Sequence, residues 1–125
     1  MNTDQLKAVL DSHLLWLRGV SSGVRADLSR ANLSRANLSG ADLSRADLSG
    51  AILSWASLTE ANLTGAILSW AILSWENLSR ASLTEAILMR ANLSKANLTE
   101  AILSGATLPP ISILPEGTLI GWTRG

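Results

Sequence analysis

Leucine recurs at every fifth residue from Leu28 to Leu108, which gives seventeen leucines in one unbroken register. Alanine stands two residues before each of them, from Ala26 to Ala106, except where Glu76 takes its place. Serine or threonine follows each leucine except at Met89 and Pro109. A period of five matches neither the 3.6 residues of a helical turn nor the two-residue alternation of a strand. The register therefore predicts a repeat architecture that is neither an ordinary helix nor an ordinary sheet.

One chain path keeps alanine and leucine inside at every repeat. Each unit forms one side of a polygon, with the small alanine near a corner and leucine filling the centre. The Asp, Asn, Ser and Thr positions then face outward, where their side chains can bond the nearby backbone. Short strand-like bridges between successive coils, about 4.8 Å apart, satisfy the remaining backbone groups.

Units such as Ala41-Asp42-Leu43-Ser44-Arg45 and Ala91-Asn92-Leu93-Ser94-Lys95 resemble the pentapeptide-repeat family, and the resemblance covers residues 26–108. It implies an all-β solenoid, a right-handed quadrilateral β-helix with four repeats per coil. The array then has about four coils and is only about 20 Å long, with its stability coming from stacked neighbours. The chain departs from the family in having no phenylalanine at any central position, so the interior is expected to be narrow and uniform.

The two ends fall outside the register. Residues 1–25 carry apolar residues at helical spacing and are expected to form an N-terminal helical cap, with Thr3 or Asp4 as its N-cap. The opening segment is also similar to leaders of bacterial family members. Residues 109–125 are expected to form an irregular C-terminal cap, because a solenoid otherwise exposes its last coil. Trp16 and Trp122 are expected to pack within these caps.

With four repeats per coil, residues twenty apart lie above one another, and the outward deviations from the repeat then gather in one place. Isoleucines stack on two adjacent faces of the middle coils, and tryptophans occupy the neighbouring corners. We expect one continuous binding patch made of Trp55, Trp70, Trp75, Ile52, Ile67, Ile72, Ile87 and Met89.

Two interpretations of this patch stand side by side. Outward isoleucines can simply form ladders that stabilise the coils, as β-branched residues do on a sheet. Three outward tryptophans favour a contact surface, because Trp is enriched at interface hot spots. A homodimer is favoured over a separate protein partner, since a symmetric dimer uses one self-complementary patch twice. Association with a membrane surface through the same patch, beside Arg30, Arg35 and Arg90, is an alternative.

The composition argues against several other functions. Ten basic and ten acidic residues cancel, so a nucleic-acid partner is not expected. The family resemblance implies DNA mimicry against gyrase as a further alternative. A mimic about 20 Å long would need roughly a dozen excess acids, since B-DNA carries one charge per ~1.7 Å, and the chain has none in excess.

No set of residues suggests an enzyme, a cofactor, a metal site or a small-molecule substrate. Glu76 replaces an inward alanine and must be paired, neutralised or displaced outward, because a lone buried carboxylate is costly. A local distortion in which its carboxylate reaches solvent or a backbone amide is favoured, and it has no visible partner for acid–base chemistry. The lone histidine, His13, is expected to be a capping or half-buried residue rather than a metal ligand. The absence of cysteine and of a signal peptide fits a cytoplasmic protein.

Overall fold

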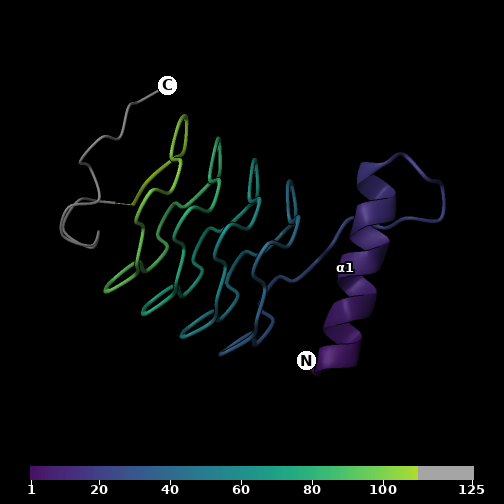
Figure 1. The fold of residues 1–125 in the computed structure, drawn as a ribbon, viewed down its shortest axis with the longest axis horizontal. Helices are drawn as coiled ribbons and strands as arrows, with labels where there is room; N and C mark the ends of the chain where they lie inside the picture. Colours follow the sequence, from purple (N-terminus) through teal and green to yellow (C-terminus); the bar gives the residue numbers. More distant parts are fainter. Residues whose placement is uncertain (110–125) are drawn as a thin grey trace.

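The computed structural model describes residues 1–109, which form one helix followed by a stack of coils (Figure 1). Helix α1 spans Thr3–Leu17. Its N-cap is Asn2, whose side chain accepts the Gln5 backbone N–H at 2.8 Å while the Gln5 side chain accepts the Asn2 N–H at 2.9 Å. This reciprocal pair is a capping box, so the predicted N-cap at Thr3 or Asp4 is wrong. The predicted C-terminal cap lies, apart from Pro109, outside the described residues.

Each repeat from Leu28 to Leu103 ends in a tight turn that begins at its leucine. In the first, the Ala31 N–H donates to the Leu28 carbonyl at 3.1 Å, and Arg30 at the third place of the turn has a φ of 60°. Among residues 1–109, twelve residues other than glycine adopt this left-handed conformation, each at the same place in its repeat. Such a conformation costs a non-glycine residue roughly 1 kcal/mol or more, so the bonds between coils must compensate for it.

Successive coils are held in a register of twenty residues. The Leu28 N–H donates to the Asp47 carbonyl at 2.7 Å, and the Asp47 N–H donates to the Ala26 carbonyl at 3.0 Å. Parallel bridges repeat this pattern, for example from Asp27 to Asp47 and on to Ile67, Ile87 and Thr107. Within residues 1–109 these are single-residue bridges rather than continuous strands, as the five-residue repeat predicts.

The bridges define four faces, and the turns define four corners between them. We number the coil levels from the helix end: residues 27–46 form the first, 47–66 the second, 67–86 the third and 87–106 the fourth. The faces are numbered in chain order from their first-level bridge residues, which are Asp27, Asn32, Asn37 and Asp42.

The interior is a continuous column of leucine edged by alanine. Leucines from Leu28 to Leu93 are buried, as are most of the alanines beside them. Outside, a local bond recurs at many repeats: the Asp27 carboxylate accepts the Ser29 hydroxyl at 2.6 Å and the Ser29 N–H at 3.1 Å. These hydrogen bonds hold the pKa of the Asp27 carboxyl below its usual value. The outward polar positions thus stabilise the turns, as their residue types predict.

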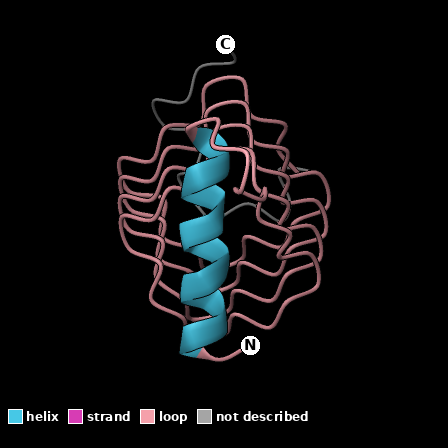
Figure 2. Ribbon diagram, turned by 90° about the vertical axis from the view of Figure 1, so that its right-hand side faces the viewer, coloured by secondary structure: helices cyan, strands magenta, loops and turns pink. Residues whose placement is uncertain are grey.

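His13 joins helix α1 to the coils. Figure 2 shows the helix lying across the end of the stack. The His13 ring is fully buried; Nδ1 accepts the Ala26 N–H at 2.9 Å, and Nε2 lies 2.9 Å from the Ser44 carbonyl. Because a carbonyl only accepts, Nε2 must carry the proton. His13 is therefore a structural link, buried more deeply than the half-buried position expected for it.

Trp16 packs at the same junction, as expected. Its ring stacks on His13 with centroids 5.5 Å apart, and the Arg45 guanidinium lies 5.0 Å from the Trp16 ring centroid. In the segment between the helix and the first coil, the Arg25 Nε donates to the Arg45 carbonyl at 2.6 Å. The helix thus contacts the first coil through both apolar and polar groups. The other tryptophan assigned to a cap, Trp122, lies outside the described residues.

Candidate functional site

The isoleucines of the patch form two stacks on adjacent faces. Ile67 and Ile87 pair on the first face, and Ile52 and Ile72 pair on the second. Ile72 and Ile87 are exposed, as is Met89 beside the first face, whereas Ile52 and Ile67 are partly buried. The two faces therefore carry the apolar surface that the register predicts. Stacking between coils covers part of Ile52 and Ile67.

The tryptophans occupy the two corners that border the second face. Trp55 and Trp75 are stacked with ring centroids 5.0 Å apart and planes 1° from parallel. Trp70 stands at the other corner, with the Arg90 guanidinium 4.9 Å from its ring centroid. The three side chains remain 56%, 51% and 62% exposed for Trp55, Trp75 and Trp70. Stacking thus leaves more than half of each tryptophan open to solvent.

Basic residues lie above and below the tryptophans at these two corners. The first corner reads Arg30, Gly50, Trp70 and Arg90 from the first level to the fourth. The next corner reads Arg35, Trp55, Trp75 and Lys95. The tryptophans therefore lie on the middle two levels of these corners, bounded at both ends by positive charge.

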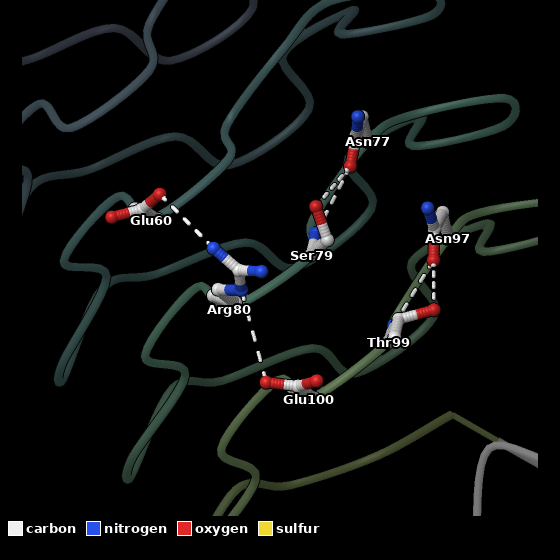
Figure 3. Close-up of polar contacts among 7 residues, drawn as sticks. All are labelled: Glu60, Asn77, Ser79, Arg80, Asn97, Thr99 and Glu100. Atoms are coloured by element: carbon white, nitrogen blue, oxygen red, sulfur yellow. Dashed lines mark hydrogen bonds and ion pairs between the residues drawn. The ribbon is translucent and has the colours of Figure 1, made fainter.

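The corner between the third and fourth faces has a different chemistry. Arg80 lies between two carboxylates, with Nη1 3.6 Å from Glu60 Oε1 and Nε 3.7 Å from Glu100 Oε2 (Figure 3). All three side chains are exposed, so these ion pairs add little to stability. This corner carries two acidic residues and one basic residue and has no apolar residue to extend the patch.

Glu76 points into the leucine interior and does not reach solvent. Its side chain is 1% exposed, and neither carboxyl oxygen has a hydrogen-bond partner. The nearby Leu58 N–H already donates to the Asn77 carbonyl at 2.8 Å. Burial raises the pKa of Glu76 to about 9, and the nearby Leu58 amide acts in the opposite direction. The expectation that this carboxylate reaches solvent or a backbone amide is therefore wrong, and the group is a buried neutral acid at pH 7.

The coil is spread where Glu76 enters it. The Asn77 N–H lies 3.3 Å from the Ala56 carbonyl, and the Trp75 N–H lies 3.2 Å from the Ser94 carbonyl, whereas the other bonds between coils are 2.7–3.0 Å. The equivalent bond from Trp55 to Ser74 is not formed among the described residues. A glutamate stands where the repeat has a methyl-sized side chain, and the bonds between coils are lengthened or lost at the corner that carries the tryptophan pair.

Within residues 1–109, no three His, Asp or Glu side chains converge closely enough to hold a metal ion. In the same part of the chain, no helix has the length and apolar character needed to cross a membrane. The feature that stands out is the apolar, aromatic surface of the middle levels.

The repeat pattern matches a known family. The family described as Pentapeptide repeats matches residues 26–65, 36–74 and 77–108, in eight copies. The chain belongs to the pentapeptide-repeat family. Its coils are those of the family's right-handed quadrilateral β-helix, and members of the family are generally structural or interaction modules rather than enzymes.

Solved structures of pentapeptide-repeat proteins resemble this one. The alr5209 protein of Nostoc PCC 7120 is 40% identical over 89% of this chain and 88% of its own, with a TM-score of 0.75. HetL, involved in heterocyst differentiation regulation in Nostoc PCC 7120, is 37% identical over 70% of this chain and 51% of its own, with a TM-score of 0.44. QnrB1, a plasmid-mediated fluoroquinolone resistance protein, is 18% identical over 66% of this chain and 63% of its own, with a TM-score of 0.33. No curated protein matches the chain.

Proposed function

We propose that this pentapeptide-repeat protein is a non-catalytic interaction module that self-associates through the Ile/Trp patch defined above. The observation that supports the proposal is the exposure of three tryptophans on adjoining corners of the middle levels. Isoleucine ladders account for Ile52 and Ile67, which are partly buried by stacking. They do not account for Trp70, whose ring faces solvent beside a single arginine.

The area of the patch supports a dimer of modest affinity. A tryptophan has roughly 150–250 Å² to bury, so three half-exposed rings offer about 250–400 Å² per chain. A two-fold dimer uses the patch twice, which gives about 500–800 Å² before the isoleucines, Met89 and the arginine stems are added. Specific interfaces bury at least about 1,000 Å² in total. The whole patch reaches this lower limit, while the tryptophans alone do not.

Substitution of the tryptophans tests the proposal. Trp55, Trp70 and Trp75 are changed together to serine, and the sedimentation coefficient is measured over a range of concentrations. The control changes Arg80, Glu85 and Glu100 to serine, because these residues occupy the same turn position with the same left-handed φ. We expect a dimer for the wild type and the control and a monomer for the tryptophan variant.

The self-association proposal fails if the wild type is a monomer at about 100 µM, a concentration that corresponds to a binding free energy of only ~5.5 kcal/mol. It also fails if the tryptophan variant keeps the dimer mass. A monomeric wild type that captures a protein partner through the same tryptophans would support the interaction module but reject the homodimer.

The basic residues beside the patch favour a second candidate, binding to an anionic membrane surface. Aromatic and apolar side chains bordered by Arg30, Arg35 and Arg90 have the composition of an interfacial binding site. Flotation with vesicles containing an anionic lipid tests this candidate, and the tryptophan variant serves as its control. Absence of the wild type from the floating fraction rejects it.

DNA mimicry against gyrase has less support from this chain. Ten basic and ten acidic residues give no excess negative charge, and the ends of the patch are positive. A duplex mimic needs dense negative charge along its axis. We expect the protein to leave gyrase supercoiling unchanged, and inhibition at stoichiometric protein would overturn this expectation.

A further inference from the structure

Two columns of residues, one on the second face and one at its corner, have the same order of residue types whether they are read from the first level to the fourth or in reverse. The face reads Asn32, Ile52, Ile72, Asn92 from the first level to the fourth. The corner beyond it reads Arg35, Trp55, Trp75, Lys95. Consider a two-fold rotation that exchanges the first level with the fourth and the second with the third. It sets each residue of these columns opposite one of the same chemical type in the second copy: asparagine, isoleucine, tryptophan or a basic residue.

The other corner departs from this symmetry at one pair of positions. Gly50 lies at the second level and Trp70 at the third, between Arg30 and Arg90. A Cβ atom at Gly50 would have only Arg30 Cγ near it, at 3.4 Å. The corner therefore presents a projecting indole next to a position without a side chain. Under the same rotation, Gly50 of one copy faces Trp70 of the other.

We propose that two copies of this chain pack antiparallel through the second face, so that each Trp70 lies over Gly50 of the other copy. The two-fold axis lies in the plane of the interface. It runs across the second face between the second and third levels, perpendicular to the solenoid axis. This proposal rests on the proposed function, because it describes how the same patch self-associates. Ile52 of one copy then meets Ile72 of the other, and the remaining patch residues on the first face lie at the edge of the contact.

A second two-fold axis is possible in the plane of the same face. An axis parallel to the solenoid brings the two corners against each other at equal levels. Trp70 then meets Trp75 of the other copy, while Gly50 meets Trp55. The antiparallel dimer instead pairs Trp70 with Gly50 and Trp55 with Trp75, so the projecting indole and the position without a side chain meet at a single corner.

The basic ends of the columns add a dependence on salt. Arg30 faces Arg90 of the other copy in the antiparallel dimer, and Arg35 faces Lys95. These charges lie at the rim, where repulsion is weak but sensitive to ionic strength. We expect the dimer to tighten as salt is raised. Binding to an acidic protein or an anionic lipid surface would weaken instead.

Single cysteines test the orientation, because the chain has no cysteine of its own. Arg30→Cys and Arg90→Cys are mixed and treated with a short bismaleimide, and Arg90→Cys is mixed with Lys95→Cys in parallel. The antiparallel dimer brings residue 30 of one copy to residue 90 of the other, so the first mixture gives the cross-linked dimer. Each variant alone gives little product. More product from the second mixture, or none from either, overturns the proposal.

A substitution at Gly50, the corner position without a side chain, gives a second, independent test. Gly50→Trp adds an indole where the corner has none, and Trp55 shows that the same turn position accepts tryptophan. If self-association depended only on the amount of exposed apolar surface, the added indole would tighten it. In the antiparallel dimer it blocks the partner's Trp70, so we expect the dissociation constant to rise about tenfold or more, equivalent to ~1.4 kcal/mol.

Gly40→Trp is the matched control, because Gly40 has the same conformation, nothing near its Cβ direction, and a place on a corner outside the patch. It should leave the dissociation constant unchanged. An unchanged or tighter dimer in Gly50→Trp overturns the antiparallel proposal but not self-association. A wild type that stays monomeric overturns both.

Discussion

Replacing Glu76 with alanine should stabilise the protein at neutral and alkaline pH and remove most of its pH dependence. The pKa of Glu76 rises from 4.5 to about 9 on folding because the carboxyl is buried. Between these values the folded state holds a proton that the unfolded state has lost. The free energy of unfolding therefore falls as pH rises, by ~1.4 kcal/mol per pH unit for one group. From pH 5 to pH 8 the loss is about 4 kcal/mol, a large part of the stability of a small domain.

Alanine suits this position because Ala56 and Ala96 occupy the same interior column, directly below and above it. The substitution restores the repeat and should shorten the 3.3 Å contact between Asn77 and Ala56. Glu76→Gln is the control, since it keeps the volume and cannot ionise. It should lose the pH dependence but keep the cost of a buried polar group without a partner.

Urea unfolding followed by circular dichroism at pH 5, 6, 7 and 8 measures these effects. We expect the free energy of unfolding to fall with pH for the wild type and to stay nearly level for both variants, with Glu76→Ala the more stable of the two. A wild type whose stability is the same at pH 5 and pH 8 would refute the reasoning, because it would mean that Glu76 is not buried as a neutral acid.

Three further substitutions test the fold. His13→Ala removes the acceptor for the Ala26 N–H and the group beside the Ser44 carbonyl, and should cost about 2–4 kcal/mol in urea unfolding; a loss below ~0.5 kcal/mol would contradict the role of this junction. Leu63→Ala, at a fully buried central position, should cost roughly 2–5 kcal/mol by the same assay. Arg80→Ser breaks two long, exposed ion pairs and should leave the unfolding midpoint within error of the wild type. A marked loss for Arg80→Ser would show that the corner charges hold the coils together.

The inward positions could be predicted from steric fit, whereas the twenty-residue coil followed from the resemblance to the pentapeptide-repeat family. A leucine every fifth residue and an alanine two places earlier leave one way to bury both, and the observed bridges join residues twenty apart. The same spacing correctly placed Ile67 with Ile87 and Trp55 with Trp75. The exposure of the tryptophans could also be predicted, because a side chain at an outward corner of a rigid coil cannot fold back into the core.

The details that depended on a single hydrogen bond could not be predicted. Asn2, Thr3 and Asp4 are all good N-cap residues, and only the reciprocal bond with Gln5 selects Asn2. The burial of His13 depends on how the helix lies against the first coil, which the repeat does not specify. Displacement of Glu76 toward solvent or a backbone amide was favoured over neutralisation because a buried charge is costly, but a neutral acid escapes much of that cost. The role of the patch in binding stays a prediction.

The mass of the wild-type chain in solution tests the central claim most directly. Light scattering over a hundredfold dilution should show twice the 13.2 kDa chain mass at the highest concentration and a decline toward the monomer on dilution, with the dimer persisting to lower concentration in high salt. A mass of 13.2 kDa at every concentration and every ionic strength would contradict the claim that the tryptophan-bearing faces bind a second copy.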